Sequence, residues 1–305
     1  MRCRWCCGSG LFKDFTLLTP CPYPWLMDLI ITLSCVDQPG IVHAMTTSVL
    51  SCGGNITENQ QFTDPITHTF VMRTRFETDQ SLTNVESSIT AGLSHLKPKI
   101  TIRPVDQKKK ALILVTTESH CLRDLLYLKE LDELPIEIPA VISNHQTLRS
   151  LVESHGIAFH HIDTEKLGKE KAESQIKELA EQNKVDFLLL ARYMQILSPT
   201  FCQSFDGRVI NIHHSFLPGF KGAKPYHQAH ARGVKIIGAT AHFVTAHLDE
   251  GPIIEQDVAH VSHTSTPEDL IALGRDIERR VLAKAVKLYA QDRIFIVGER
   301  TVVFS

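Results

Sequence analysis

The chain has 305 residues and a formal net charge of −2, with 32 Lys and Arg residues against 34 Asp and Glu residues. At about 150 residues per domain, this length predicts two domains, each able to bury its own core. Because acidic and basic residues are balanced and interspersed, no basic field for nucleic acid is expected.

Apolar runs and cysteine spacing narrow the class of protein further. No uninterrupted apolar run reaches the ~20 residues needed to cross a bilayer, so no membrane association is expected. Five of the 8 cysteines lie in the first 35 residues, which is not the spacing of a disulfide scaffold. This usage is typical of a cytoplasmic, reduced protein. Cys3 and Cys6 lack a second ligand pair at zinc spacing, so no metal is expected there.

Residues 1–27 are predicted to be a disordered extension. Their apolar content is interrupted by Lys13, Asp14 and three prolines, whereas the core of a secretory signal would be continuous. An organelle-targeting segment and a natural start at Met27 both remain open interpretations.

Residues 28–105 follow the order strand, helix, strand, strand, helix, strand. The strands are expected at 29–34, 55–63, 67–76 and 99–103, and the helices at 41–50 and 80–96. This βαββαβ order predicts a ferredoxin-like domain. A small sheet with open edges gains from pairing, so we expect a homo-oligomer.

Residues 106–110 form a charged linker, and residues 111–305 are expected to form a mostly parallel, Rossmann-like α/β domain. Its strands are predicted at 111–115, 136–142, 186–191, 209–213 and 235–244. Its helices are predicted at 121–131, 148–155, 169–183, 225–231 and 267–290, before a hairpin of 293–297 with 301–304. Ligands of such sheets bind beyond the carboxyl ends of the strands.

A polar pair emerges where the apolar strand 209–213 ends. Asn211 and His213 share one face of that strand, because side chains two residues apart point to the same side. Asp249 comes from a separate loop that Gly251-Pro252 turns sharply. An amide, an imidazole and a carboxylate can stabilise an oxyanion and move a proton without a metal or a covalent nucleophile. Taken singly, each residue is better explained by a structural role: Asn211 by a strand cap, His214 by a core histidine and Asp249 by an Asx-turn. Their joint arrival after two different strands favours function.

These motifs resemble the folate-dependent formyltransferase family. Its glycinamide ribonucleotide transformylases carry Asn-Ile-His-Pro-Ser-Leu-Leu-Pro and Leu-Asp-Gly-Gly-Pro, and here the residues are Asn-Ile-His-His-Ser-Phe-Leu-Pro (211–218) and Leu-Asp-Glu-Gly-Pro (248–252). The 211–218 stretch and Gly-Ala-Lys-Pro-Tyr-His-Gln-Ala (222–229) are more similar to the hydrolytic branch, the formyltetrahydrofolate deformylases. That branch also places an ACT-like domain before the catalytic domain, and the likeness covers about residues 28–305.

The resemblance implies a hydrolase of a linear amide C–N bond, which converts 10-formyltetrahydrofolate to tetrahydrofolate and formate. Asp249 would activate the water, while Asn211 and His213 would stabilise the oxyanion. No cofactor is expected, because the folate derivative is the substrate. The enzyme would then regulate the one-carbon pool and supply formate for purine biosynthesis.

The resemblance also implies a set of substrate-binding residues. The stretch 192–199 is similar to the Met-Arg-Ile-Leu-Ser-Pro segment that holds the pteridine ring in transformylases, with Gln195 in place of the arginine. Composition by itself favours ordinary core for the apolar residues of this stretch. The residues expected to contact the substrate are Arg192, Met194, Ile196, Leu197, His214, Thr245, His247 and Leu248.

An ACT-like domain implies an amino-acid effector bound between paired domains. The corresponding residues are Asp37, Gln38, Gly40, Asn55 and Ile56. The equally weighted alternative is that these residues only form turns and caps.

The turn after the strand at 111–115 bears on the choice of nucleophile. In transformylases this turn is glycine-rich, because backbone N–H groups must approach the phosphate of the acceptor. Here it reads Thr-Thr-Glu-Ser-His-Cys (116–121), and Glu118 would repel a phosphate. Water is therefore the expected nucleophile. Three alternatives remain: formyl transfer to another amine, a non-enzymatic amino-acid sensor, and a metal-dependent hydrolase using His213, His214 and His247.

Overall fold

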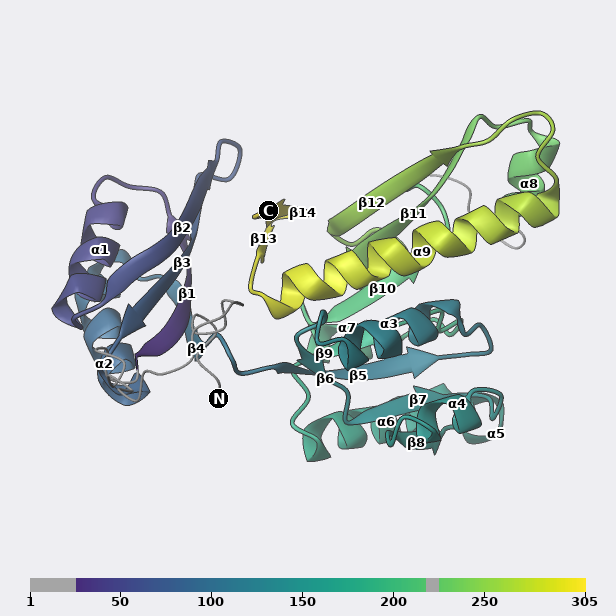
Figure 1. The fold of residues 1–305 in the computed structure, drawn as a ribbon, viewed down its shortest axis with the longest axis horizontal. Coiled ribbons are helices and arrows are strands. Elements are labelled where there is room, and N and C mark those ends of the chain that lie inside the picture. The colour runs from purple at the N-terminus through teal and green to yellow at the C-terminus, as the bar shows by residue number, and fades with distance from the viewer. Residues whose placement is uncertain (1–25, 218–224) are drawn as a thin grey trace, which may run out of the picture.

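The computed structural model describes residues 26–217 and 225–305, which form two units joined by a short connection (Figure 1). The expected extension falls almost wholly outside the described residues, as do the glycines and lysines of the loop 218–224. The N-terminal unit contains β1 (Met27–Val36), α1 (Ile41–Ser51), β2 (Asn55–Asp64), β3 (Thr69–Thr78), α2 (Leu82–Leu93), the 3-10 turn η1 (Ser94–Leu96) and β4 (Lys99–Pro104).

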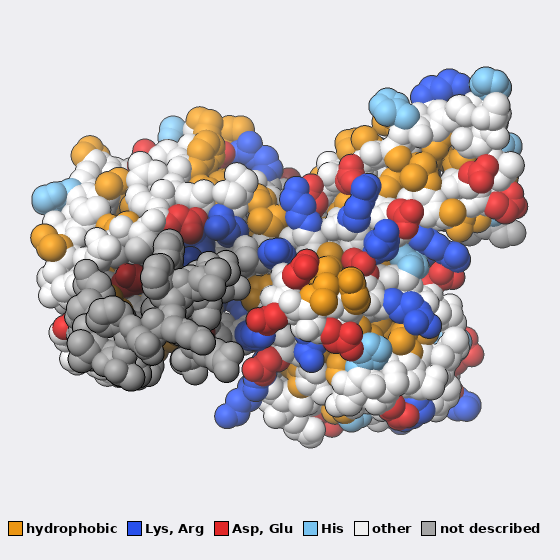
Figure 2. All heavy atoms as spheres, in the orientation of Figure 1, with side chains coloured by type: hydrophobic (Ala, Val, Ile, Leu, Met, Phe, Trp, Pro, Cys, Tyr) orange, Lys and Arg blue, Asp and Glu red, His pale blue; other side chains and the backbone are white. Residues whose placement is uncertain are grey.

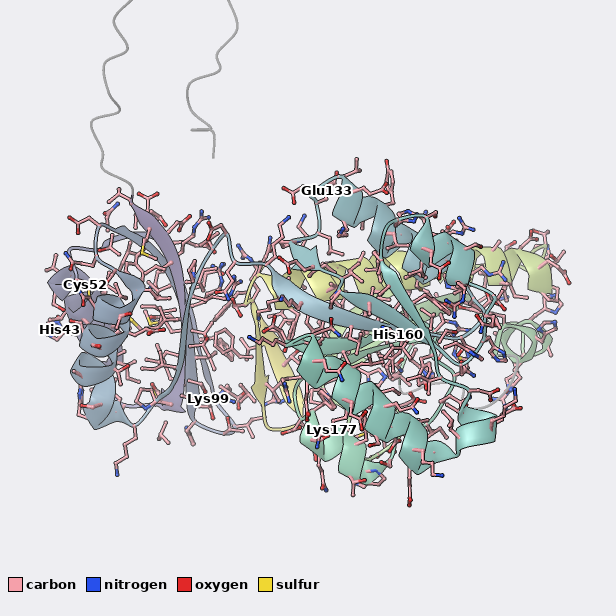
Figure 3. The ribbon with its side chains drawn as sticks, turned by 90° about the horizontal axis from the view of Figure 1, so that it is seen from below. His43, Cys52, Lys99, Glu133, His160 and Lys177 are labelled. Carbon is pink, nitrogen blue, oxygen red and sulfur yellow. The ribbon has the colours of Figure 1, made fainter. Side chains whose placement is uncertain are left out.

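The N-terminal unit is a four-stranded antiparallel sheet with the strand order β2-β3-β1-β4. The predicted order of strands and helices is confirmed. Helices α1 and α2 cover the face that points away from the rest of the chain, as Figure 3 shows for α1 at His43 and Cys52. Alternate residues of β1, including Leu29, Ile31 and Leu33, are fully buried beneath these helices.

The five candidate effector residues do not come together within one chain. β1 and β2 both run antiparallel to β3, so the turn after β1 and the start of β2 lie at opposite ends of the sheet. Asp37, Gln38 and Gly40 are therefore separated from Asn55 and Ile56 by the length of a ten-residue strand, about 30 Å. A shared site would need a second copy of the unit.

The C-terminal unit alternates strands and helices along the chain. Its first half contains β5 (Lys109–Val115), α3 (His120–Glu130), β6 (Ile136–Glu137), β7 (Ala140–Ser143), α4 (Arg149–Glu153), β8 (Ala158–His161), α5 (Thr164–Leu167), α6 (Lys169–Gln182) and β9 (Phe187–Leu190). Its second half contains α7 (Pro199–Ser204), β10 (Val209–His213), α8 (Pro225–Ala231), β11 (Ile236–Phe243), β12 (Ile253–His260), α9 (Pro267–Ala290), β13 (Ile294–Val297) and β14 (Arg300–Val303).

These strands form a mostly parallel sheet in the order β12-β11-β10-β9-β5-β7-β8, with β6 paired to β5. The strands from β10 to β8 are parallel, and β11 and β12 extend the sheet as antiparallel strands. Ile113 and Val115 of β5 contribute to the core under α3 and α9, whereas Leu112 and Leu114 contribute to the core under α6 and α7. A strand covered on both faces explains its continuous apolar sequence.

Several boundaries differ from the predictions. β5 begins at Lys109, inside the expected linker, because Lys109 and Lys110 pair with β6. The single strand expected at 136–142 is divided into β6 and β7, since Pro139 has no N–H to continue a ladder. β8, β12 and α7 were not predicted. β12 is half-exposed and carries charged residues, so it lacks the apolar run of its neighbours.

Helix α9 begins as its sequence predicts. Thr266 caps it and Asp269 completes a capping box, with Pro267 in the first turn. At its far end the carbonyl oxygens of Tyr289, Ala290 and Gln291 accept hydrogen bonds from three cations.

Two of these cations belong to the N-terminal unit: Arg103 Nη2 lies 2.6 Å from Ala290 O and Arg73 Nε lies 3.0 Å from Gln291 O. The third, Lys109 of β5, reaches Tyr289 O at 3.0 Å. The end of α9 thereby joins the two units.

The hairpin β13–β14 completes the junction between the units (Figure 1). Its side chains Phe295 and Val297 form a small buried cluster with Phe304 and with Val71 of β3. Acidic and basic side chains are interspersed over the face in Figure 2. Within the described residues, no helix combines the length and apolarity that a membrane span requires.

Candidate active site

Two strands place polar side chains opposite each other at one edge of the sheet. Asn211 on β10 is paired in register with His242 on β11, and directly opposed residues project to the same face. Asn211 Nδ2 lies 3.2 Å from His242 Nε2. His213, two residues further along β10, shares that face as predicted.

The loop after β11 brings Asp249 to this pair. His213 Nδ1 lies 3.3 Å from Asp249 Oδ1, and His242 Nε2 lies 3.7 Å from the same oxygen. Asp249 has a left-handed backbone with φ 57°, which few residues other than glycine adopt. A Cβ on Gly251 would lie 1.8 Å from the carbonyl oxygen of Phe243, so only glycine lets the loop return this closely to β11. The sharp turn predicted behind Asp249 is confirmed.

The hydrogen bonds of His242 fix its tautomer and the orientation of the Asn211 amide. Because His242 Nδ1 lies 2.8 Å from the carbonyl oxygen of Phe243, Nδ1 must carry the proton and donate it. In the neutral ring, Nε2 is then an acceptor and takes a hydrogen bond from Asn211 Nδ2. The second Nδ2 proton of Asn211 remains for another acceptor.

The electrostatics of the site favour an ionised Asp249. Hydrogen bonding from His213 holds the pKa of this carboxyl well below its ordinary range. Nε2 of His213 is buried and has no hydrogen-bond partner among the described residues. A site with a fixed carboxylate and an unpaired imidazole nitrogen can bind a polar substrate group and exchange a proton with it.

His214 lies between this set and the interior. Its ring makes edge contacts with His213 and Tyr226, at centroid distances of 5.0 Å and 6.4 Å. Burial, then the positive charge of Arg192, lowers the pKa of His214 from 6.5 to about 4. His214 is therefore neutral at physiological pH.

A cavity of about 320 Å³ lies over these side chains. All eleven candidate catalytic and substrate-binding residues line it: Asn211, His213, Asp249, Arg192, Met194, Ile196, Leu197, His214, Thr245, His247 and Leu248. The structure therefore brings together residues from two strand ends and two loops.

The apolar residues at this cavity divide into two kinds. Met194, Ile196 and Leu248 are 57%, 62% and 57% exposed, so they are not ordinary core residues. Leu197 is buried in the core beneath α6 and α7. Exposed apolar side chains beside a cavity are typical of a ligand site.

His242 is the residue that the sequence did not single out. It lies in the mostly apolar strand β11, and it is 2% exposed. Its signal was the register: an antiparallel neighbour of β10 must place some residue opposite Asn211.

The turn 116–121 lies close to the same cavity. Thr116 Oγ1 accepts a hydrogen bond from the backbone N–H of Met194 at 3.0 Å. Glu118 forms an ion pair with Arg275 at 3.2 Å. The turn 116–121 contains no glycine, and contacts of the Thr116 and Glu118 side chains hold it in place.

A metal site of His213, His214 and His247 finds no support in the geometry. Among the described residues, these histidines do not gather their ring nitrogens into one ligand group.

The fold and the site together define a formyl transferase-type α/β protein, and the family model described as formyl transferase matches residues 109–286. The solved glycinamide ribonucleotide transformylase 1 from Symbiobacterium toebii shares the C-terminal unit, with a TM-score of 0.62 and 30% identity over 65% of this chain and 95% of that chain.

Relatives that match over most of the chain define its family more closely. The formyltetrahydrofolate deformylase of Corynebacterium sp. (strain P-1) is 45% identical over 278 residues, which is 90% of this chain and 97% of that protein. The crystal structure of the formyltetrahydrofolate deformylase from Burkholderia mallei has a TM-score of 0.87 at 43% identity, covering 92% of this chain and 100% of that chain. The chain belongs to the formyltetrahydrofolate deformylase family.

Proposed function

We propose that this chain hydrolyses 10-formyltetrahydrofolate to tetrahydrofolate and formate. The observation that carries the proposal is the convergence of Asn211, His213 and Asp249 in one cavity, in a chain whose long relatives are named as deformylases. No metal and no covalent intermediate is required, because these three groups supply a base, an oxyanion site and a proton.

Asp249 activates the water. Its low pKa keeps the carboxylate ionised throughout the working pH range, and its left-handed backbone turns it toward His213. The carboxylate accepts a hydrogen bond from the water and draws a proton from it as the oxygen attacks the formyl carbon.

Asn211 and His213 stabilise the charge that develops on the formyl oxygen. His242 holds the Asn211 amide in place through one Nδ2 proton, which leaves the second Nδ2 proton for the formyl oxygen. Nε2 of His213 has no competing partner among the described residues. A protonated His213 donates from Nδ1 to Asp249 and from Nε2 to the oxyanion. When the carbon–nitrogen bond breaks, His213 passes its proton to the departing folate nitrogen and regains a proton from Asp249, which lies 3.3 Å away. The product leaves as formic acid and ionises to formate.

The other cavity residues bind the folate. Met194, Ile196 and Leu248 offer exposed apolar surface to the flat pteridine ring. Leu197 and the Met194 backbone, anchored on Thr116, set the position of this surface. Arg192, His214, Thr245 and His247 supply polar contacts around it.

The test is release of tetrahydrofolate from 10-formyltetrahydrofolate by purified protein with no amine acceptor present. Asp249→Asn should abolish most of the release, whereas Asp257→Asn, on the half-exposed strand β12, should not. No release by the wild type, together with measurable folate binding, would refute hydrolysis and require a search for an amine acceptor.

We further propose a division into an ACT-like regulatory domain at 28–105, a joint at 106–110 and a catalytic domain at 111–305. The antiparallel β2-β3-β1-β4 sheet and the start of the family match at residue 109 support it. An amino-acid effector would bind between two copies, with Asp37, Gln38 and Gly40 from one and Asn55 and Ile56 from the other.

This arrangement makes a homo-oligomer the working form, and regulated hydrolysis would set the supply of formate for purine biosynthesis. Light scattering tests the oligomer, and hydrolysis assays with each amino acid test the effector. A monomer whose rate no amino acid alters would refute this second proposal.

A further inference from the structure

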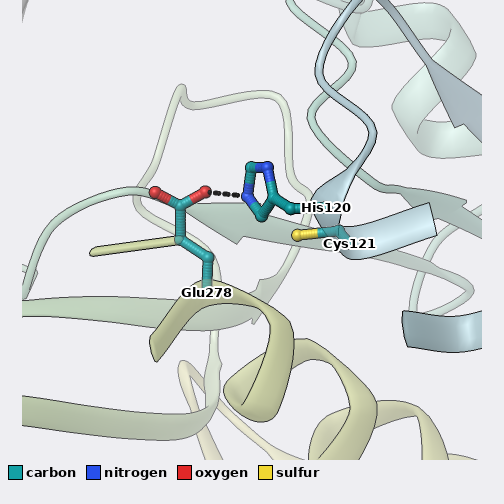
Figure 4. A group of neighbouring side chains, drawn as sticks. All are labelled: His120, Cys121 and Glu278. Atoms are coloured by element: carbon teal, nitrogen blue, oxygen red, sulfur yellow. Dashed lines mark hydrogen bonds and ion pairs between the residues drawn. The ribbon is translucent and has the colours of Figure 1, made fainter. Parts of the chain in front are cut away.

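A carboxylate lies buried behind the cavity wall, outside the group that acts on the formyl carbon. Glu278, in the middle of α9, is 1% exposed. Its Oε1 accepts a hydrogen bond from Tyr226 Oη at 2.7 Å, and its Oε2 lies 2.8 Å from His120 Nε2 (Figure 4). A charge this deep is costly unless other groups compensate it.

Arg192 supplies the compensating charge and connects Glu278 to the cavity. Its Nε lies 3.5 Å from Glu278 Oε2 and has no hydrogen-bond partner among the described residues. Arg192 follows β9 with a left-handed backbone, φ 65°, and its side chain lines the cavity. A strained backbone persists only where surrounding contacts hold it.

The cluster is better suited to holding an arginine than to binding a metal. Ligand atoms of His120, Cys121 and Glu278 lie within 4.8 Å of one another (Figure 4). However, both oxygens of Glu278 already have partners, and the nearby guanidinium would repel a cation. Burial also raises the pKa of the Cys121 thiol, which disfavours the thiolate that a metal needs.

We propose that Glu278 is a positioning residue of the active site: its buried carboxylate, held by His120 and Tyr226, fixes the Arg192 side chain in the cavity wall beside His214. This inference rests on the proposed hydrolysis. Glu278 acts through Arg192 and does not contact the substrate.

Arg192 contributes to the electrostatic environment of His214. The charged and titratable groups around His214 are Arg192, His213, Glu278, Asp249 and Tyr226. Burial and Arg192 keep the ring neutral, and its buried Nδ1 has no partner among the described residues. A neutral imidazole beside His213 can hydrogen-bond the attacking water without competing for the Asp249 carboxylate.

A double-mutant cycle with Glu278→Gln and Arg192→Met tests the proposal, with Glu268→Gln on the exposed first turn of α9 as the matched control. Glu278→Gln should lower kcat/KM by about 2- to 150-fold, which is the range of coupling energies between residues in contact. The double variant should lose no more than Arg192→Met. Full activity of Glu278→Gln, or additive losses in the double variant, would overturn the proposal.

Two further measurements keep the outcome clear. If Glu278→Gln does not unfold cooperatively, the variant Tyr226→Phe takes its place, because it removes only one donor to the carboxylate. A reduced kcat/KM at an unchanged Tm supports the proposal. An unchanged kcat/KM overturns it. The wild type in the same assay separates failure of the proposed hydrolysis from failure of the positioning role of Glu278. An inactive wild type refutes the hydrolysis. The cycle is then read on the Kd for tetrahydrofolate, where additive effects again overturn the positioning role.

Discussion

Replacing His242 by phenylalanine probes the orientation of Asn211, the proposed oxyanion donor. His242 is 2% exposed, so phenylalanine fills a similar buried space. The change removes the acceptor for Asn211 Nδ2 at 3.2 Å and the donor to Phe243 O at 2.8 Å. The Asn211 amide then loses the contact that selects its orientation.

The expected loss follows from these contacts. A buried polar group that loses its partner costs about 1–3 kcal/mol, which corresponds to about 5- to 150-fold in kcat. Deleting the oxyanion donor itself costs more, about 2.7–4 kcal/mol or 100- to 1,000-fold, so Asn211→Ala should be the slower variant. KM should change by less than about threefold, because His242 belongs to the polar end of the site.

The assay is release of tetrahydrofolate under saturating and limiting 10-formyltetrahydrofolate, with Tm measured for each variant. His260→Phe, at the exposed end of β12, is the matched control and should retain wild-type rates. His242→Gln keeps an acceptor oxygen and should recover part of the activity. An unchanged kcat in His242→Phe, or a loss confined to KM, would refute the assigned orientation of Asn211.

Three other perturbations have defined outcomes. Met194→Ser removes a 57% exposed apolar side chain from the proposed folate surface. KM should rise about tenfold with kcat nearly constant, since one apolar side chain contributes about 1.5–3 kcal/mol on burial. An unchanged KM would remove Met194 from the site. Gly251→Ala places a Cβ against Phe243 O, so calorimetry should show a loss of about 1–3 kcal/mol and the assay a loss of kcat; wild-type values for both would contradict the close approach. The pKa of His214 is lowered from 6.5 to about 4, so the unfolded state binds more protons and the free energy of unfolding should fall by up to about 3 kcal/mol as the pH drops across that interval. Denaturant titrations of wild type and His214→Asn measure this slope, and equal slopes would contradict it.

The three candidate catalytic residues could be placed together from the sequence because they lie at or after strand ends. The polar face of β10 and the Gly-Pro turn after Asp249 are local patterns, and parallel strands end at a common edge of a sheet. Sequence therefore located Asn211, His213 and Asp249, and the resemblance supplied the candidate substrate-binding residues that line the same cavity.

Residues that act through tertiary pairing were harder to predict. His242 depends on the β10–β11 register, and Glu278 depends on which face of α9 is buried. A signal for Glu278 did exist: it lies four residues before Leu282 and one after Ile277, on the apolar stripe of the helix, where an unpaired carboxylate would be unfavourable. For the candidate effector residues the difficulty was the reverse. Their local motifs could be recognised in the sequence, but the order of the strands in the sheet separates them within one chain.

The junction between the units has a consequence for synthesis of the chain. Val71 of β3 is covered by Phe295, Val297 and Phe304, which lie more than 200 residues later in the sequence. At about 5–20 residues per second, the ribosome needs roughly ten seconds or more to add that length. During this interval Val71 lacks the three side chains that bury it in the finished chain. A chain that ends before Phe295 should therefore expose Val71 and leave the N-terminal unit without this contact to the hairpin.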